Sequence, residues 1–125
     1  MNSKNGVPAL EIVQLEMHLA FADLVAESFE TAVDKALAKV GGRAILTLRL
    51  DEDPNYQRVT GVVVGEAHVA LVFLTRDGQS VVVEAAEHSR HPMAEIALSR
   101  AAEGDLRQQT VPRTGLYFSR ILRRN

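Results

Sequence analysis

The feature that most constrains the fold is a hairpin signal, where "RDGQ" (76–79) separates two apolar runs, "AHVALVFL" (67–74) and "SVVVEAAE" (80–87). Asp-Gly between apolar runs is typical of a tight β-turn, because the favoured turns need positive φ at their central residues. If Asp77 and Gly78 are the loop residues, the register follows. It pairs Leu74 with Val81, Val72 with Val83, and Ala70 with Ala85. The sequence therefore predicts an antiparallel hairpin here.

Both faces of this hairpin are apolar. One face carries the three pairs named above, and on it the same register puts His68 opposite Glu87. The other face carries Val69, Leu71, Phe73, Val82 and Ala86, with Glu84 among them. One face should meet the helices, and the other needs a cover, for which the C-terminal segment and a second subunit are both candidates.

Periodicity predicts the other elements. Residues 13–21, 43–50 and 57–64 alternate between apolar and polar residues, or nearly so, which favours half-buried strands. Apolar residues between 25 and 40 recur at the spacing of one helical face, which predicts a helix that begins at Asp23 as N-cap. Gly41-Gly42 should end that helix.

A second helix is expected from residue 92 to about residue 107. Pro92 suits the first helical turn, and Gly104 weakens the helix near its end. Between the predicted strands 43–50 and 57–64, "DEDPN" (51–55) is typical of a turn or loop, and Gly61 in the second of these strands is a candidate bulge.

The predicted fold is therefore α+β. We expect a two-layer sandwich in which a mostly antiparallel sheet of four to five strands has two helices on one face, in the order β-α-β-β-β(-β)-α. The 125 residues fit a single domain, 1–125. We expect a flexible N-terminus at 1–9 and a tail at 110–125 that can be ordered against the sheet.

Composition excludes several classes of protein. The chain has no cysteine, so disulfides, thiolate metal sites and cysteine nucleophiles are absent. No apolar run approaches the length of a membrane span, and the N-terminus lacks a basic stretch followed by an apolar core. We therefore expect a cytoplasmic protein with no signal peptide and no membrane partner.

The residues give no catalytic signature. There is no nucleophile-elbow motif and no glycine-rich phosphate loop. We expect no enzyme and no cofactor, although hydrolysis by a pair of carboxylates stays open. The weak metal candidates are His88, His91 and Glu87, with Glu84 nearby; Pro92 disfavours helical geometry at His91, so a solvent-exposed connection is the expected structure.

Charge is distributed unevenly along the chain. Residues 1–89 carry 7 Lys/Arg and 13 Asp/Glu, whereas residues 90–125 carry 7 Arg and 3 acids. Arginine presents a planar fork of donors that suits phosphate. These arginines are the candidate nucleic-acid-binding residues: Arg90, Arg100, Arg107, Arg113, Arg120, Arg123 and Arg124, joined by Lys35, Lys39 and Arg43. A solvated helix face with a frayed tail is the alternative.

Two stretches, "LVAESFETAVDKALAKVGGRA" (24–44) and "VVVEAAEHSRHPMAEIALSRAAEGDLRQQ" (81–109), resemble the ribosome hibernation-promoting factors and their small ribosome-associated relatives. The shared pattern is a first helix that ends in a basic turn, and a Val-rich strand that runs through "EA" into a second helix. The resemblance implies a non-enzymatic β-α-β-β-β-α domain that binds rRNA on the small ribosomal subunit, with a role in translation regulation and the stress response.

A protein partner is the alternative to RNA. An apolar sheet face around Val69, Leu71 and Phe73 would suit a homodimer or an adaptor domain that binds no nucleic acid.

Overall fold

The computed structural model describes residues 9–110, and the side chains of residues 9–103. Its elements in chain order are α1 (Leu10–Ala20), α2 (Phe29–Val40), β1 (Arg43–Arg49), β2 (Tyr56–Val64), β3 (His68–Thr75), β4 (Val81–Ala85), a short 3-10 turn η2 (Ala86–His88) and α3 (Met93–Thr110). Of the predicted terminal segments, 1–9 and 110–125, residues 1–8 and 111–125 lie outside the described residues.

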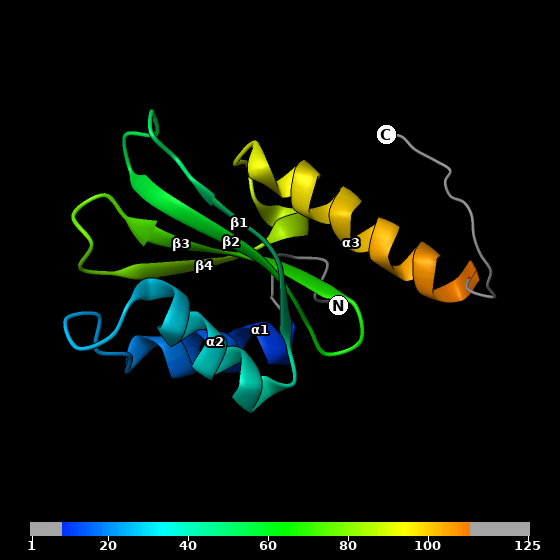
Figure 1. The fold of residues 1–125 in the computed structure, drawn as a ribbon, viewed down its shortest axis with the longest axis horizontal. Coiled ribbons are helices and arrows are strands. Elements are labelled where there is room, and N and C mark those ends of the chain that lie inside the picture. Colours follow the sequence, from blue (N-terminus) through cyan, green and yellow to red (C-terminus); the bar gives the residue numbers. More distant parts are fainter. Residues whose placement is uncertain (1–8, 111–125) are drawn as a thin grey trace.

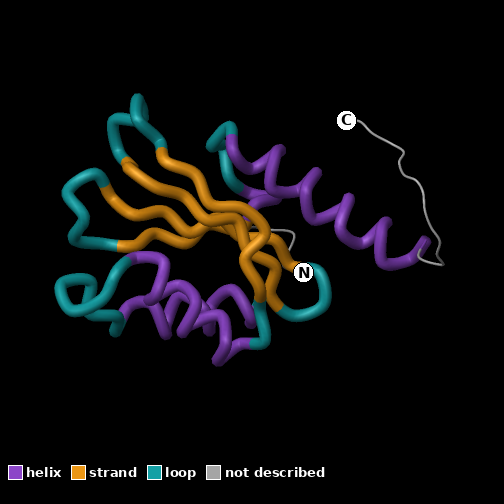
Figure 2. The backbone as a smooth tube through the Cα atoms, in the orientation of Figure 1, coloured by secondary structure: helices purple, strands orange, loops and turns teal. Residues whose placement is uncertain are grey.

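The four strands form one antiparallel sheet in the order β1-β2-β3-β4, so each strand pairs with the next one along the chain (Figures 1 and 2). The predicted α+β class and antiparallel sheet are confirmed. The hairpin register is also confirmed, since Leu74 pairs with Val81, Val72 with Val83 and Ala70 with Ala85. Gly78 has φ of 76°, which explains why this turn uses glycine.

The predicted contact between His68 and Glu87 is wrong. β4 ends at Ala85, and the chain then enters η2, so Glu87 is no longer in the ladder. His68 pairs with Val64 of β2 instead. Its Nε2 lies 3.9 Å from Oε1 of Glu11.

The first predicted strand, 13–21, is also wrong, because this segment is helix α1. Ile12, Leu15 and Leu19 are buried, and their spacing of three and four residues is that of one helical face. A second set of apolar residues lies on the opposite side of the helix. The two sets together give the alternating pattern that a strand would show.

Helix α2 begins later than predicted. Ser28 is its N-cap, and the Ser28 hydroxyl accepts a hydrogen bond from the backbone N–H of Thr31. Asp23 instead caps a separate turn, where its carboxylate accepts from the N–H groups of Val25 and Ala26. The predicted end is confirmed, since Gly41 has φ of 72°.

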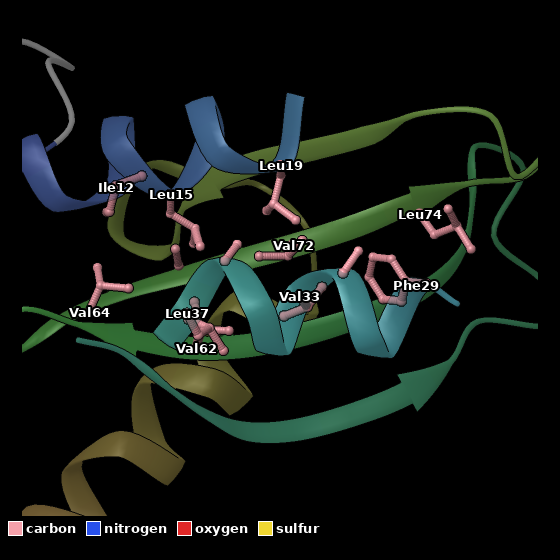
Figure 3. Close-up of a cluster of buried hydrophobic side chains, with 13 residues drawn as sticks. Ile12, Leu15, Leu19, Phe29, Val33, Leu37, Val62, Val64, Val72 and Leu74 are labelled. Atoms are coloured by element: carbon pink, nitrogen blue, oxygen red, sulfur yellow. The ribbon is translucent and has the colours of Figure 1, made fainter. Parts of the chain in front are cut away.

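Helices cover both faces of the sheet, which corrects the expectation that the two predicted helices share one face. Helices α1 and α2 pack on one face, and α3 packs on the other (Figure 1). Figure 3 shows the first core, in which side chains of α1 and α2 meet those of β2 and β3. The members labelled there are Ile12, Leu15, Leu19, Phe29, Val33, Leu37, Val62, Val64, Val72 and Leu74.

The second core lies beneath α3. Leu71 and Phe73 are fully buried there against Met93, Ala94 and Ala97. The apolar face that we predicted as a homodimer surface around Val69, Leu71 and Phe73 is therefore covered by α3 of the same chain.

The predicted bulge at Gly61 is wrong, and the irregularity lies on the facing strand. The register of β1 against β2 shifts between Ala44 and Leu46. Gly61 has another function, because a Cβ at this position would lie 3.3 Å from Cβ of Ala97. The missing side chain lets α3 approach the sheet closely.

Candidate functional site

The junction before α3 contains the most elaborate polar network among the described residues. The His91 ring lies between two loops that are 38 residues apart in the sequence. Its Nδ1 accepts a hydrogen bond from the backbone N–H of Met93 at 3.1 Å, so Nδ1 carries no proton. In the neutral ring Nε2 then holds the proton and donates it to Oδ2 of Asp53 at 2.8 Å. His91 thus joins the start of α3 to the loop between β1 and β2.

Asp53 is held by three hydrogen bonds. Its Oδ1 accepts from the N–H groups of Asn55 and Tyr56 at 2.9 and 3.0 Å, and Oδ2 accepts from His91. Burial acts to raise the pKa of Asp53, but the hydrogen bonds from Asn55, His91 and Tyr56 outweigh it and hold this pKa below its ordinary value. Asp53 is therefore a charged anchor for the turn.

Arg76 of the β3–β4 hairpin closes the same loop from the other side. Its Nη2 donates to the carbonyl oxygens of Leu50, Asp53 and Tyr56 at 2.5, 2.5 and 2.9 Å. Its backbone N–H donates to the Asn55 carbonyl. One side chain thus binds three carbonyl oxygens between residues 50 and 56, which fixes the loop.

Aromatic rings form the floor of the network. Tyr56 stacks on Phe73 with ring centroids 4.3 Å apart, and the His91 ring lies 4.8 Å from Phe73. Burial, and then the negative charges of Glu84 and Asp53, raise the pKa of Tyr56 above its ordinary value.

This geometry supports a structural role for His91. One ring nitrogen accepts from the backbone and the other lies against a carboxylate, so neither is free to take a proton from a bound molecule. The Ser89 hydroxyl does not face the ring. It donates to Oε1 of Glu84 at 2.6 Å and accepts from the backbone N–H of His91.

The predicted metal candidates are not brought together. Nε2 of His88 lies 3.3 Å from Oε2 of Glu87, on the surface, whereas His91 faces Asp53. Within residues 9–110 no group of three or more His, Cys, Asp or Glu side chains could hold a metal ion.

The predicted nucleic-acid-binding arginines lie in several places. Arg90 is exposed before α3, and Arg100 is exposed on α3 in a shallow hollow that it shares with Glu95 and Glu103. Arg107 lies in α3, where side chains are not described. Outside the described residues are Arg113, Arg120, Arg123 and Arg124.

The lysines proposed to join these arginines lie elsewhere. Lys35 and Lys39 are exposed on α2, which covers the opposite face of the sheet from α3. Nζ of Lys35 is also 2.9 Å from Oε1 of Glu27. The described residues therefore do not gather these cations on one surface.

A second candidate site is the outer face of α1, which we define as Leu10, Val13 and Met17 of the helix together with Phe21, its C-cap. Leu10, Met17 and Phe21 are 67%, 58% and 87% exposed, and Val13 is half-buried. The buried residues of α1 lie on the opposite side of the helix, because each step of one residue turns the helix by about 100°. In the following turn Val25 is 91% exposed. Helix α1 is thus apolar on two opposite sides.

Sequence reasoning missed both sites. The outer face of α1 was hidden because residues 13–21 also fit a strand, although the spacing of Ile12, Leu15 and Leu19 is a helical signal. The Asp53–His91 contact had one local clue. Asp-Pro-Asn is a sequence in which the aspartate side chain accepts from the N–H groups that follow it.

Comparison of this chain with protein-family models, with curated proteins and with solved structures finds no match. No helix within residues 9–110 is long and apolar enough to span a membrane.

Proposed function

We propose that this chain is a non-enzymatic, cytoplasmic protein-interaction domain that binds its partner through the outer face of α1. The observation that carries the proposal is the exposure of Leu10, Met17 and Phe21 on one side of a helix whose other side is buried. A helix that only covers a sheet needs one apolar stripe. The second stripe suits a further layer of protein.

The spacing of the outer face favours a helical or otherwise rod-like partner. Leu10, Val13 and Met17 follow one another at steps of three and four residues, and Phe21 comes four residues later as the C-cap of α1. This is the spacing of the seam along which two helices pack. The methionine and phenylalanine can fill irregular gaps in the partner surface.

The charge around the outer face indicates the chemistry of the partner. Residues 5–34 hold six acids and no Lys or Arg. Glu16 and Asp23 are exposed, and Glu11 is partly exposed beside the stripe. Such surroundings attract cations and repel acidic segments. The partner is therefore an apolar segment that also carries Lys or Arg.

A ribosomal or other RNA partner is the second candidate, favoured by one observation in the sequence. Residues 111–125 contain four arginines and no acid, and the resemblance to hibernation-promoting factors points the same way. The described domain argues against it, since residues 9–110 hold nine Lys/Arg and sixteen Asp/Glu, a net charge of −7. Phosphate binding relies on positive charge.

A capture experiment from lysate separates the two candidates. Three chains serve as bait: wild type, Met17→Glu, and the matched control Ile96→Glu, which changes an exposed apolar residue of α3. Each is tested at two salt concentrations, with and without RNase. We expect wild type to capture a protein in an amount that RNase does not change. Met17→Glu should reduce that amount at least tenfold, and Ile96→Glu should leave it unchanged. Bound material that RNase and salt remove, and that Met17→Glu retains, would refute the protein-interaction proposal in favour of RNA.

A further inference from the structure

We propose that residues 111–125 of the same chain occupy the outer face of α1 when no other partner is bound. This inference rests on the proposed function, because it names the segment that fills the proposed surface. The segment reads "VPRTGLYFSRILRRN" and combines the two properties that the surface selects. It has four arginines with no acid, and its apolar side chains include Leu116, Tyr117, Phe118, Ile121 and Leu122.

Charge complementarity is the first argument. The region 5–34, which includes α1, has six acids and no Lys or Arg, and no other stretch of comparable length has that composition. Of these acids Glu16 and Asp23 are exposed without a side-chain ion pair among the described residues. Arginine binds carboxylates through two parallel hydrogen bonds, which suits an acidic rim around an apolar stripe.

Apolar matching is the second argument. Tyr117 and Phe118 are followed four residues later by Ile121 and Leu122, whereas Arg120, Arg123 and Arg124 fall between and after them. This spacing separates an apolar side from a basic side if the segment docks as a helical turn. The apolar side would meet Leu10, Met17 and Phe21, and the arginines would meet the rim.

Reach is the third argument. Helix α3 ends at Thr110, so fifteen residues follow it. The first apolar side chain of the stretch that docks, Leu116, is six residues beyond Thr110, so the connection spans up to about 20 Å when extended, whereas a domain of about 100 residues has a radius of gyration of about 13 Å. The connection between α3 and the docking stretch is therefore longer than the radius of gyration of such a domain.

Tethering favours the same chain over a second copy. A short flexible tether gives an effective concentration on the order of millimolar. At micromolar protein the intramolecular contact is thus favoured about a hundredfold or more over the same contact between two chains. An external partner of the proposed kind has to displace the segment, which makes the segment a built-in competitor at the binding surface.

The absence of cysteine from the chain makes a direct test possible. The double variant Met17→Cys/Ser119→Cys is oxidised mildly at micromolar concentration, and the products are mapped by mass spectrometry under non-reducing conditions. The control is Ser99→Cys/Ser119→Cys, in which Ser99 is exposed on α3, the helix that leads into the segment. Thermal unfolding verifies that both variants keep the fold.

We expect the disulfide between the cysteines at positions 17 and 119 to form within one chain at least about tenfold faster than the disulfide of the control. This difference in rate should fall when Arg120, Arg123 and Arg124 are changed to Glu, or when salt is raised to 1 M. A rate no greater than that of the control would overturn the proposal, and so would covalent dimers as the main product, which would point to a second copy. If capture of a partner still depends on Met17 but the two double variants form their disulfides at the same rate, the docking of residues 111–125 is refuted while the proposed protein-interaction function is not. If both fail, both fall.

Discussion

The helical structure of residues 10–20 makes Leu15 and Met17 differ sharply, whereas a strand would place them on the same face. In α1 Leu15 is fully buried and Met17 is 58% exposed. Replacing a buried leucine by alanine loses the transfer free energy of the removed methyl groups and leaves a cavity, a total of about 2–5 kcal/mol. We expect Leu15→Ala to lower the free energy of unfolding by about 3 kcal/mol, near the middle of that range, because the side chain lies between α2 and the sheet. Met17→Ala should change it by no more than about 0.5 kcal/mol.

The assay is urea denaturation followed by far-ultraviolet circular dichroism, since the chain has no tryptophan to report by fluorescence. With a slope of about 2 kcal/mol per M of urea, a loss of about 3 kcal/mol lowers the midpoint of the transition by about 1.5 M. The slope of the transition should be unchanged, so that the shift reports stability. Equal destabilisation by Leu15→Ala and Met17→Ala would refute the assignment of opposite faces.

Three other predictions concern the turns of the fold. Asp53→Asn should lower the free energy of unfolding by about 1–3 kcal/mol, because an amide donor then faces either the His91 N–H or the backbone N–H groups. Asp51→Asn changes an exposed carboxylate and is the control, and an equal loss of stability in both variants would contradict the network. The pKa of Asp53 is lower in the folded state than in the unfolded state, so its charged form stabilises the fold above about pH 4, and this stabilisation is lost as pH falls through the folded pKa. The difference in free energy of unfolding between wild type and Asp53→Asn should therefore shrink below about pH 4 in acid denaturation. A difference that does not change with pH would argue against the lowered pKa. Gly42→Ala should cost about 1–3 kcal/mol by thermal unfolding, because its Cβ would lie 2.9 Å from the carbonyl oxygen of Val63, and a neutral result would show that the backbone can move.

The hairpin was predictable because its information is local. Asp77-Gly78 sets the turn, and the turn sets the register of every pair along β3 and β4. The start of α3 at Met93 was predictable for the same reason, since Pro92 acts on its immediate neighbours. Elements whose signals lie within about four residues of one another can be read from a single sequence.

Helix α1 could not be predicted in this way because two apolar stripes overlap in the sequence. Val13 and Met17 belong to the outer face, while Leu15 and Leu19 belong to the core, and in order they alternate with polar residues. Only the packing against α2 and the sheet decides between a period of two and a period of 3.6. A functional surface on a covering helix thus weakens the pattern by which that helix is recognised.

The placement of α3 shows a different limit. The two apolar faces of the β3–β4 hairpin indicated that something must cover each of them, but no residue states which element does so. In the structure the missing side chain of Gly61 leaves room for Ala97 of α3. As a sequence letter Gly61 fits a bulge equally well, and only the facing strand distinguishes the two.

The network around His91 has a consequence for how the molecule opens. It ties Asn55, Tyr56 at the start of β2 and Met93 at the start of α3 to one carboxylate and one ring, which come from the two loops that precede these elements. Neither loop can fray without breaking the hydrogen bonds of the other, so the two should open as one cooperative unit in native-state hydrogen exchange. The amides of Asn55, Tyr56 and Met93 would then share one opening free energy. That free energy would be determined by the packing of α3 on the sheet, and not by the solvent exposure of each loop.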